Sequence, residues 1–397
     1  MAYKLLLVSD FDPAELARID LTGVSSHEAA VERIQRHSLG WSWCHQQAFQ
    51  ELGVACSTLI PASAAVRHHW QAGRAMAAAP TDRPHDLPPP LAYVLEAVRA
   101  ERPDVLLLEN PAFLDARALT LLRDQAERPR LVTHLCAALP PAATATLAFY
   151  DLVLCCSPHF LTLARTQGAR VTLHYHAAPP AALELPPPPL ASRLRRACFA
   201  GSIVAGSRYH ARRLRLLRQA CRAGVPIDLF SAPPISRPLA ALKSRGGGGA
   251  SRLVRGLEAL EQRLTAGSPL RKALRPPVYG QAMFHTLQRY ICTVNVHAGM
   301  AQGFAANMRL FEAAALGVCL ISEDHPNLND LFTPEREILT YRTGQDLIQR
   351  LRFCIDHPEA AGAIGERARE RALQSHRYAH RATVLHGQLL DLLGRNG

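Results

Sequence analysis

The segment Asn307–Glu312 combines amide, cationic and acidic side chains at the predicted start of a helix. Gly317 ends this helix, and the buried strand Val318–Ser322 is expected to follow at once. Free N–H groups and the positive end of the helix dipole favour an anion at such a place. A carboxylate accepts hydrogen bonds from two hydroxyls, so Glu312 is a candidate ligand of a ribose diol, with Arg309 facing phosphates. The alternative is that Glu312 only stabilises the helix N-terminus.

Asp10 is the candidate catalytic base in the first half of the chain. It follows the predicted strand Lys4–Ser9, and reacting groups collect at the carboxyl ends of strands in parallel sheets. An aspartate at this position also favours a turn, and that alternative stays open.

The sequence shows no pattern typical of a metal site or of a bound cofactor. The ten cysteines lack a C-x-x-C pair and any regular spacing to histidine, so they are expected to be reduced core residues. An H-E-x-x-H motif is also absent. Negative charge on a leaving group is therefore expected to be neutralised by arginine and helix-end amides, without a metal ion.

The net charge of +12 lies in the second half of the chain. Residues 1–180 hold 15 Lys and Arg against 17 Asp and Glu, whereas the remaining residues hold 30 against 16. The basic second half of the chain favours an anionic partner. Three kinds of partner fit: a nucleotide or sugar phosphate, an acidic membrane surface, or nucleic acid. No set of aromatic residues interleaves with the basic ones, so nucleic acid is not predicted as a partner. A general arginine bias of the chain is the alternative.

Strands and helices alternate along the chain at the spacing of β-α-β units, which predicts parallel sheets. A length of 397 residues exceeds one hydrophobic core, so two doubly wound α/β domains are expected. The predicted parts are residues 1–180, a stiff Pro-rich linker at 181–192, residues 193–365, and C-terminal helices at 366–397. All apolar runs are far shorter than the roughly 20 residues of a membrane span, and a cytoplasmic location is expected.

A set of motifs follows in order between residues 195 and 382. These are Phe199-Ala200-Gly201-Ser202 with Arg208, Val278-Tyr279-Gly280, Asn295-Val296-His297, Asn307-Met308-Arg309 with Phe311-Glu312, Gly317, Asn327-Leu328, Leu331-Phe332, Glu337, Tyr341, His357-Pro358, His376-Arg377-Tyr378 and His380-Arg381. Their order and spacing resemble the CgeB-like, group 1 glycosyltransferases. The resemblance implies the GT-B fold, in which two Rossmann-like domains face each other across a cleft and C-terminal helices return to the N-terminal domain.

The resemblance also implies a donor-binding site for a nucleotide-diphosphate sugar. Its residues are Gly201, Ser202, Arg208, Tyr279, His297, Asn307, Met308, Arg309 and Glu312. In this interpretation Glu312 binds the ribose, Gly201 and Ser202 let the backbone approach the diphosphate, and Arg208 clamps it. His134 corresponds to a histidine that touches the donor sugar, which makes it the second candidate catalytic residue. The alternatives are an exposed helix arginine at 208 and core histidines at 134 and 297.

The implied activity is metal-independent transfer of a sugar to a glycan, lipid or protein acceptor. Residues 1–180 are expected to bind the acceptor and residues 193–365 the donor, and peripheral contact with an anionic membrane at its inner face stays open. Phe304 departs from the family, because related enzymes carry a glutamate there, eight positions before Glu312. This departure favours the alternative function, a non-catalytic nucleotide-sugar or glycan-binding protein on the same scaffold.

Overall fold

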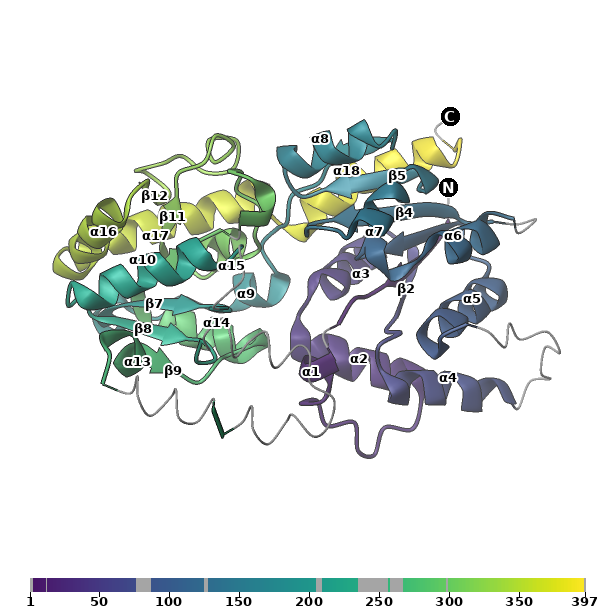
Figure 1. Cartoon of the computed structure of the whole chain (residues 1–397), viewed down its shortest axis with the longest axis horizontal. Helices are drawn as coiled ribbons and strands as arrows, with labels where there is room; N and C mark the ends of the chain where they lie inside the picture. Colours follow the sequence, from purple (N-terminus) through teal and green to yellow (C-terminus); the bar gives the residue numbers. More distant parts are fainter. Residues whose placement is uncertain are drawn as a thin grey trace. The chain divides into compact units, whose positions relative to one another are not determined.

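The computed structural model describes residues 3–11, 13–75, 87–124, 128–204, 209–234, 256–257, 267–297 and 299–395. The chain divides into two compact units (Figure 1). Unit 1 comprises residues 1–176 and 377–397, and unit 2 comprises residues 177–376. Each unit contains a parallel sheet of six strands, which confirms the predicted α/β class with two Rossmann-like domains.

The sheet of unit 1 has the strand order β2-β1-β3-β4-β5-β6. Its strands are β1 (Lys4–Val8), β2 (Ala55–Leu59), β3 (Val105–Leu108), β4 (Arg130–Leu135), β5 (Leu152–Cys155) and β6 (Val171–Leu173). The apolar runs of β1 and β3 are fully buried, as expected where helices cover both faces of a parallel sheet. The strands β2 and β3 lie on opposite sides of β1, so the winding direction reverses there.

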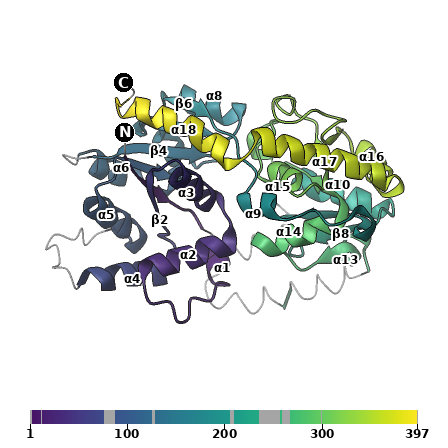
Figure 2. The same ribbon diagram turned by 180° about the vertical axis from the view of Figure 1, so that it is seen from behind.

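The helices of unit 1 come from both ends of the chain. They are α1 (Pro13–Leu16), α2 (His27–Ser38), α3 (Trp41–Glu51), α4 (Ala64–Ala75), α5 (Pro89–Glu101), α6 (Ala116–Arg123), α7 (Pro141–Ala145), α8 (Pro158–Thr166) and α18 (Tyr378–Leu392), with 3-10 turns at Pro111–Phe113 and Leu147–Phe149. Helix α18 packs against α3, and Figure 2 shows it along the same unit as β4 and β6. Its Gln388 side chain donates to the Thr172 hydroxyl at 2.9 Å, which fastens it beside β6.

The sheet of unit 2 has the order β12-β11-β10-β7-β8-β9. Its strands are β7 (Leu194–Ala200), β8 (Ile227–Phe230), β9 (Leu274–Arg275), β10 (Tyr290–Asn295), β11 (Cys319–Glu323) and β12 (Leu339–Tyr341). Its helices are α9 (Pro180–Glu184), α10 (Ala211–Arg222), α13 (Pro269–Ala273), α14 (Gly280–Gln288), α15 (Arg309–Ala315), α16 (Gly344–Asp356) and α17 (Pro358–Ser375), with 3-10 turns at Leu190–Ser192 and Gly299–Ala301. Helix α10 packs against α13 and α16, and helix α9 packs against α14 and α15 (Figure 1).

The Pro-rich segment 181–192 is not the extended linker that the sequence predicts. It begins inside helix α9 and ends in the 3-10 turn Leu190–Ser192, and both belong to unit 2. Pro180 occupies the first turn of α9, where a proline is tolerated because its missing N–H would have no partner. Leu190 packs against the core of unit 2. The segment is therefore part of a folded unit.

The return of the chain to unit 1 also differs from the predicted boundary at residue 366. Helix α17 runs without interruption through Ser375 and stays in unit 2, and only residues from Arg377 onward belong to unit 1. All ten cysteines lie in the described ranges, carry free thiols and, apart from the half-buried Cys136, are buried. Within those ranges, we find no helix with the length and apolar character needed to cross a bilayer.

Candidate functional site

The carboxyl ends of β7 and β10 form the point in unit 2 where the winding direction reverses. From β7 the chain moves to β8 and β9 on one side, and it then returns to β10 and β11 on the other. Parallel α/β sheets bind ligands in the crevice outside this point. Gly201 and Ser202 follow β7 directly, and His297 follows the end of β10. Three of the predicted donor-site residues therefore lie at this sheet edge.

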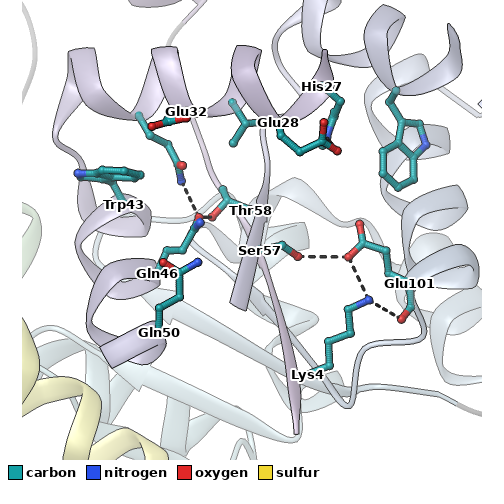
Figure 3. Close-up of a pocket in the computed structure, with 13 residues that line it drawn as sticks. Lys4, His27, Glu28, Glu32, Trp43, Gln46, Gln50, Ser57, Thr58 and Glu101 are labelled. Atoms are coloured by element: carbon teal, nitrogen blue, oxygen red, sulfur yellow. Dashed lines mark hydrogen bonds and ion pairs between the residues drawn. The ribbon is translucent and has the colours of Figure 1, made fainter. Parts of the chain in front are cut away.

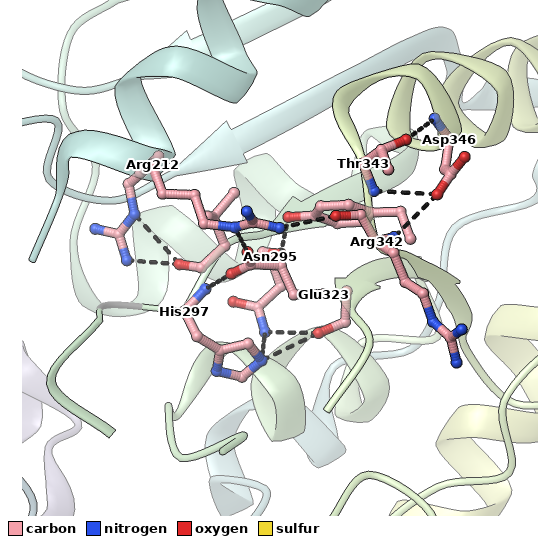
Figure 4. Close-up of polar contacts among 11 residues, drawn as sticks. Arg212, Asn295, His297, Glu323, Arg342, Thr343 and Asp346 are labelled. Atoms are coloured by element: carbon pink, nitrogen blue, oxygen red, sulfur yellow. Dashed lines mark hydrogen bonds and ion pairs between the residues drawn. The ribbon is translucent and has the colours of Figure 1, made fainter. Parts of the chain in front are cut away.

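Glu323, at the end of β11, connects the elements around this edge (Figure 4). Its buried carboxylate accepts the backbone N–H of His297 at 2.8 Å and forms an ion pair with Arg212 of α10. Arg212 also donates to the Arg342 carbonyl at 2.9 Å. The sequence analysis missed Glu323. Its position directly after a buried apolar run was the signal available for finding it.

Figure 4 shows His297 and Asn295 in an amide network, which also holds Asn307 at the same edge. The side-chain amides of Asn295 and Asn307 donate to each other's oxygen, at 3.1 and 2.6 Å. The Nε2 atom of His297 lies 3.1 Å from the Ser322 hydroxyl and 3.1 Å from the Asn295 amide nitrogen. Burial holds the pKa of His297 well below its ordinary value, so the imidazole is neutral. His297 is thus a hydrogen-bonded, buried residue of the sheet edge.

Glu312 and Arg309 face each other on the first turn of α15. The Arg309 Nη1 atom lies 2.6 Å from the Glu312 Oε2 atom, and Glu312 is only 7% exposed. The Arg309 Nε atom is buried and has no hydrogen-bond partner among the described residues. Met308 occupies the cap position of α15 but makes no side-chain capping bond. This helix end therefore presents a buried guanidinium nitrogen that can still donate a hydrogen bond.

Gly201 and Ser202 are held in place by Arg213, a residue that the sequence analysis did not select. The Arg213 guanidinium donates to the Ser202 carbonyl at 2.8 Å and to the Val296 carbonyl at 2.7 Å. It also lies over the Phe199 ring, 5.6 Å from the ring centre. Arg213 thereby ties the loop after β7 to the end of β10, which is a structural role.

Two donor-site candidates remain, Tyr279 and Arg208. Tyr279 is 45% exposed and precedes the first residue of α14. Helices of a parallel α/β sheet run antiparallel to the strands, so this position lies toward the carboxyl edge. Arg208, the predicted phosphate clamp, lies outside the described residues.

In unit 1 the corresponding reversal lies between β1 and β3, where Asp10 and Glu109 come together. The Asp10 backbone N–H donates to Glu109 Oε2 at 3.1 Å, and the Ser9 hydroxyl donates to the same oxygen at 2.9 Å. The Asn110 amide donates to the Asp10 carboxylate at 2.7 Å. Burial raises the pKa of Glu109 to about 7, which suits proton transfer near neutral pH. Glu109 was missed from the sequence, although it directly follows a buried strand.

His134, the second catalytic candidate, is an interior residue of unit 1. It is 2% exposed and stacks on Trp41 with ring centres 4.8 Å apart. Burial holds its pKa well below the ordinary value. One ligand atom from each of His134, Cys136 and His176 lies within 4.8 Å of the other two. These residues could hold a metal ion, a grouping that their sequence spacing did not reveal.

A polar pocket of about 570 Å³ lies elsewhere in unit 1, beside the edge strand β2 (Figure 3). Its wall includes Trp43, Trp70, Glu28 and the ion pair between Lys4 and Glu101, whose charged atoms are 3.5 Å apart. Lys4 begins β1, whereas Asp10 follows the end of that strand. The pocket is therefore distinct from the sheet edge that carries Asp10 and Glu109.

A family model described as "Glycosyl transferase-like" matches residues 247–387. The matched part contains β10, α15 and β11, and thus His297, Glu312 and Glu323. No curated protein was found to match the chain.

Several solved structures resemble the whole chain. HepE of Anabaena, solved with UDP and glucose, is 14% identical at a TM-score of 0.61, covering 98% of this chain and 100% of its own. A glycosyltransferase of Rickettsia africae is 10% identical, with a TM-score of 0.61. Sucrose-phosphate synthase of Thermosynechococcus elongatus is 14% identical, with a TM-score of 0.58. Both alignments cover 100% of this chain and 100% of the other chain. At these identities the likeness shows the GT-B fold.

Proposed function

We propose that this chain is a glycosyltransferase of the CgeB-like group that moves a sugar from a nucleotide-diphosphate sugar to an acceptor. The observation that carries the proposal is the family match over residues 247–387, because it spans the edge of the sheet where a ligand is expected. The GT-B fold supports it, and one protein of that fold, HepE, was solved with UDP-glucose. A hexose is the sugar class that we propose.

The donor's nucleotide is proposed to bind at α15. The Glu312 carboxylate accepts hydrogen bonds from the ribose diol, and the Arg309 guanidinium, whose Nε atom has no partner among the described residues, donates to the diphosphate. Gly201 and Ser202 supply a close backbone approach after β7. The family resemblance adds Arg208 as the phosphate clamp and Tyr279, His297, Asn307 and Met308 as lining residues.

We propose that the departure of the nucleoside diphosphate does not need a metal ion. Among the described residues at this edge, Glu312 is paired with Arg309 and Glu323 with Arg212, so the negative charge of each carboxylate is already balanced. Arginine is always charged and donates two parallel hydrogen bonds to a phosphate. Cationic side chains and helix-end amides then neutralise the leaving group.

Unit 1 is proposed to bind the acceptor, which is a glycan, lipid or protein. Asp10 and Glu109 lie at its reversal point, and both are acids that can accept a proton from an acceptor hydroxyl. Glu109 is the better suited of the two, because its pKa is raised to about 7 by burial.

A thermal-shift screen of the purified chain against UDP, GDP and TDP, with sugars of each, tests the donor site. A nucleotide that binds only the native state raises the melting temperature. We expect one nucleoside diphosphate to raise the melting temperature at sub-millimolar concentration. The nucleotide sugar with the same base should give an equal or larger shift. No shift with any of these compounds would argue against the proposed donor site.

The alternative, a non-catalytic binding protein, is favoured by Phe304 at the position of the family's glutamate. Phe304 is half-buried, and its backbone N–H donates to the Ala301 carbonyl at 3.1 Å. Both functions give a thermal shift, but only the enzyme releases nucleoside diphosphate from its donor over time. The accumulation of nucleoside diphosphate over time therefore distinguishes the enzyme from the non-catalytic binding protein.

A further inference from the structure

The carboxyl ends of β4, β5 and β6 bring thiols and imidazoles together in unit 1. The three strands are parallel neighbours, and their register aligns Leu135 with Cys155 and Cys155 with Leu173. The next residue along each strand is therefore Cys136, Cys156 or His174. Neighbouring parallel strands end at the same edge of a sheet, so these three positions lie side by side although about 20 residues separate them along the chain.

Three of the side chains at this edge are close enough to share one small ion. The Cys136 Sγ atom lies 2.8 Å from the His176 Nε2 atom. A ring nitrogen of His134 completes the group, whose three ligand atoms all lie within 4.8 Å of one another. The Nε2 atom of His134 is buried and makes no hydrogen bond within the described ranges of the chain. A buried ring nitrogen without a partner is uncommon and calls for a ligand.

The rings around the group are fixed by their own contacts. Trp41 stacks on His134, and its backbone carbonyl lies 3.0 Å from the Nδ1 atom of His45. His45 in turn pairs with His174 through their Nε2 atoms, 3.0 Å apart. The Arg381 side chain donates to the His176 carbonyl at 3.4 Å. These contacts hold the segments that carry the proposed ligands.

We propose that His134, Cys136 and His176 bind one zinc ion, which fastens β4 to the segment after β6. Two imidazoles and a thiolate are ligands that Zn²⁺ prefers, at about 2.0–2.1 Å for nitrogen and 2.3 Å for sulfur. Tetrahedral ligands at these lengths lie about 3.5 Å from one another, so side-chain adjustments of about 1 Å suffice. The Cys136 thiol loses its proton to solvent on binding, and the fourth position is left to water. This proposal is independent of the glycosyltransferase function, and it gives His134 a structural role.

The test uses the purified full-length chain, stripped of metal by a chelator and kept reduced. Titration with Zn²⁺ against a chromophoric chelator should give one tight site per chain. Cys136→Ser and His176→Asn should each weaken zinc binding by about 100-fold or more, since even indirect supporting groups are worth 10–100-fold. Cys155→Ser is the matched control, because Cys155 is a buried free thiol at the end of β5 that lies outside the three-residue group. It should bind zinc as the unmodified chain does.

Cobalt gives a readout that does not depend on whether a variant folds. The wild-type Co²⁺ complex should show the near-ultraviolet absorption of a thiolate-to-metal charge transfer and the strong visible bands of a tetrahedral site. The proposal is overturned if the wild-type chain takes up no stoichiometric zinc, if its cobalt complex lacks the thiolate band, or if a folded Cys136→Ser variant binds zinc as tightly as wild type. A zinc-induced rise in the wild-type melting temperature would support the structural role.

Discussion

Glu312 lies where it can stabilise its helix and, in the proposed donor site, also bind a ligand. The pair lies on the first turn of α15, where a carboxylate stabilises the helix dipole. The same carboxylate has the acceptor capacity for two hydroxyls, and the buried Arg309 Nε atom has no protein acceptor among the described residues. Capping alone does not account for that unsatisfied donor. The ligand interpretation does.

The variant Glu312→Gln should weaken binding of the nucleoside diphosphate by about 10-fold or more, because hydrogen bonds to a charged group contribute about 1.5–3 kcal/mol. Glu359→Gln is the matched control, since Glu359 is an exposed acid on the first turn of α17 in the same unit. Isothermal titration of both variants measures the effect. Equal affinities in the two variants would mean that Glu312 is only a helix-capping residue.

Glu109 should make the stability of the chain depend on pH. Its pKa is about 7 in the folded chain, above the ordinary value of 4.5, so the folded state holds the proton more tightly than the unfolded state. The stabilisation from this group is complete below pH 4.5 and is lost as the pH rises through 7. Glu109→Gln keeps an acceptor for Ser9 and Asp10 but does not titrate. The melting temperature of the variant minus that of wild type should therefore be larger at pH 8 than at pH 5. The same difference at both pH values would contradict the raised pKa of Glu109.

At the scale of elements, the ends of strands decide where chemistry can occur. The alternation of apolar runs and amphipathic stretches predicts both sheets, and it correctly places Gly201 and His297 at strand ends. Asp10 also follows a strand, as predicted. Glu109 and Glu323 were missed for a physical reason: each belongs to a hydrogen-bond network with partners far along the chain, such as Ser9 and Arg212. Sequence alone does not give those pairings.

The helix in the Pro-rich segment and the proximity of His134, Cys136 and His176 were missed for a related reason. Prolines in the first turn of a helix do not prevent that helix, and packing of Leu190 on the core decides the outcome at 181–192. The group of His134, Cys136 and His176 has no regular spacing because the end of β4 and the segment after β6 supply it. Motif spacing detects sites within one segment and overlooks those made by a sheet edge.

The packing of α17 on the turn at Gly317, between α15 and β11, depends on a residue without a side chain. A Cβ atom at Gly365 of α17 would lie 2.5 Å from the Gly317 carbonyl oxygen, which is a backbone atom that cannot move aside cheaply. Gly365→Ala should lower the free energy of unfolding by about 1–3 kcal/mol through overpacking. Gly387→Ala, in α18, is the control, because nothing lies within 4 Å of its added methyl group. Denaturant unfolding should show a lower free energy of unfolding for Gly365→Ala and an unchanged one for Gly387→Ala. Equal stabilities of the two variants would contradict the close contact at Gly365.

At the scale of the whole molecule, the chain supplies two units of the same architecture with different chemistry. Unit 2 carries the basic half of the sequence and the pair Arg309–Glu312, whereas unit 1 carries Asp10, Glu109 and the proposed zinc site. The C-terminal helix α18 belongs to unit 1 although the helix before it belongs to unit 2. The chain therefore passes between the units twice, at residues 176–177 and 376–377. The proposed transfer uses the donor site of one unit and the proton acceptors of the other.

The release of nucleoside diphosphate from a panel of UDP-, GDP- and TDP-sugars by the purified chain tests the central claim most directly. We predict that one donor gives product that accumulates linearly with time and enzyme concentration, and that Glu312→Gln lowers this rate while Glu359→Gln does not. Binding of a nucleotide sugar without any release above the protein-free control, in the presence of a broad set of glycan and lipid acceptors, would contradict the assignment of this chain as a glycosyltransferase.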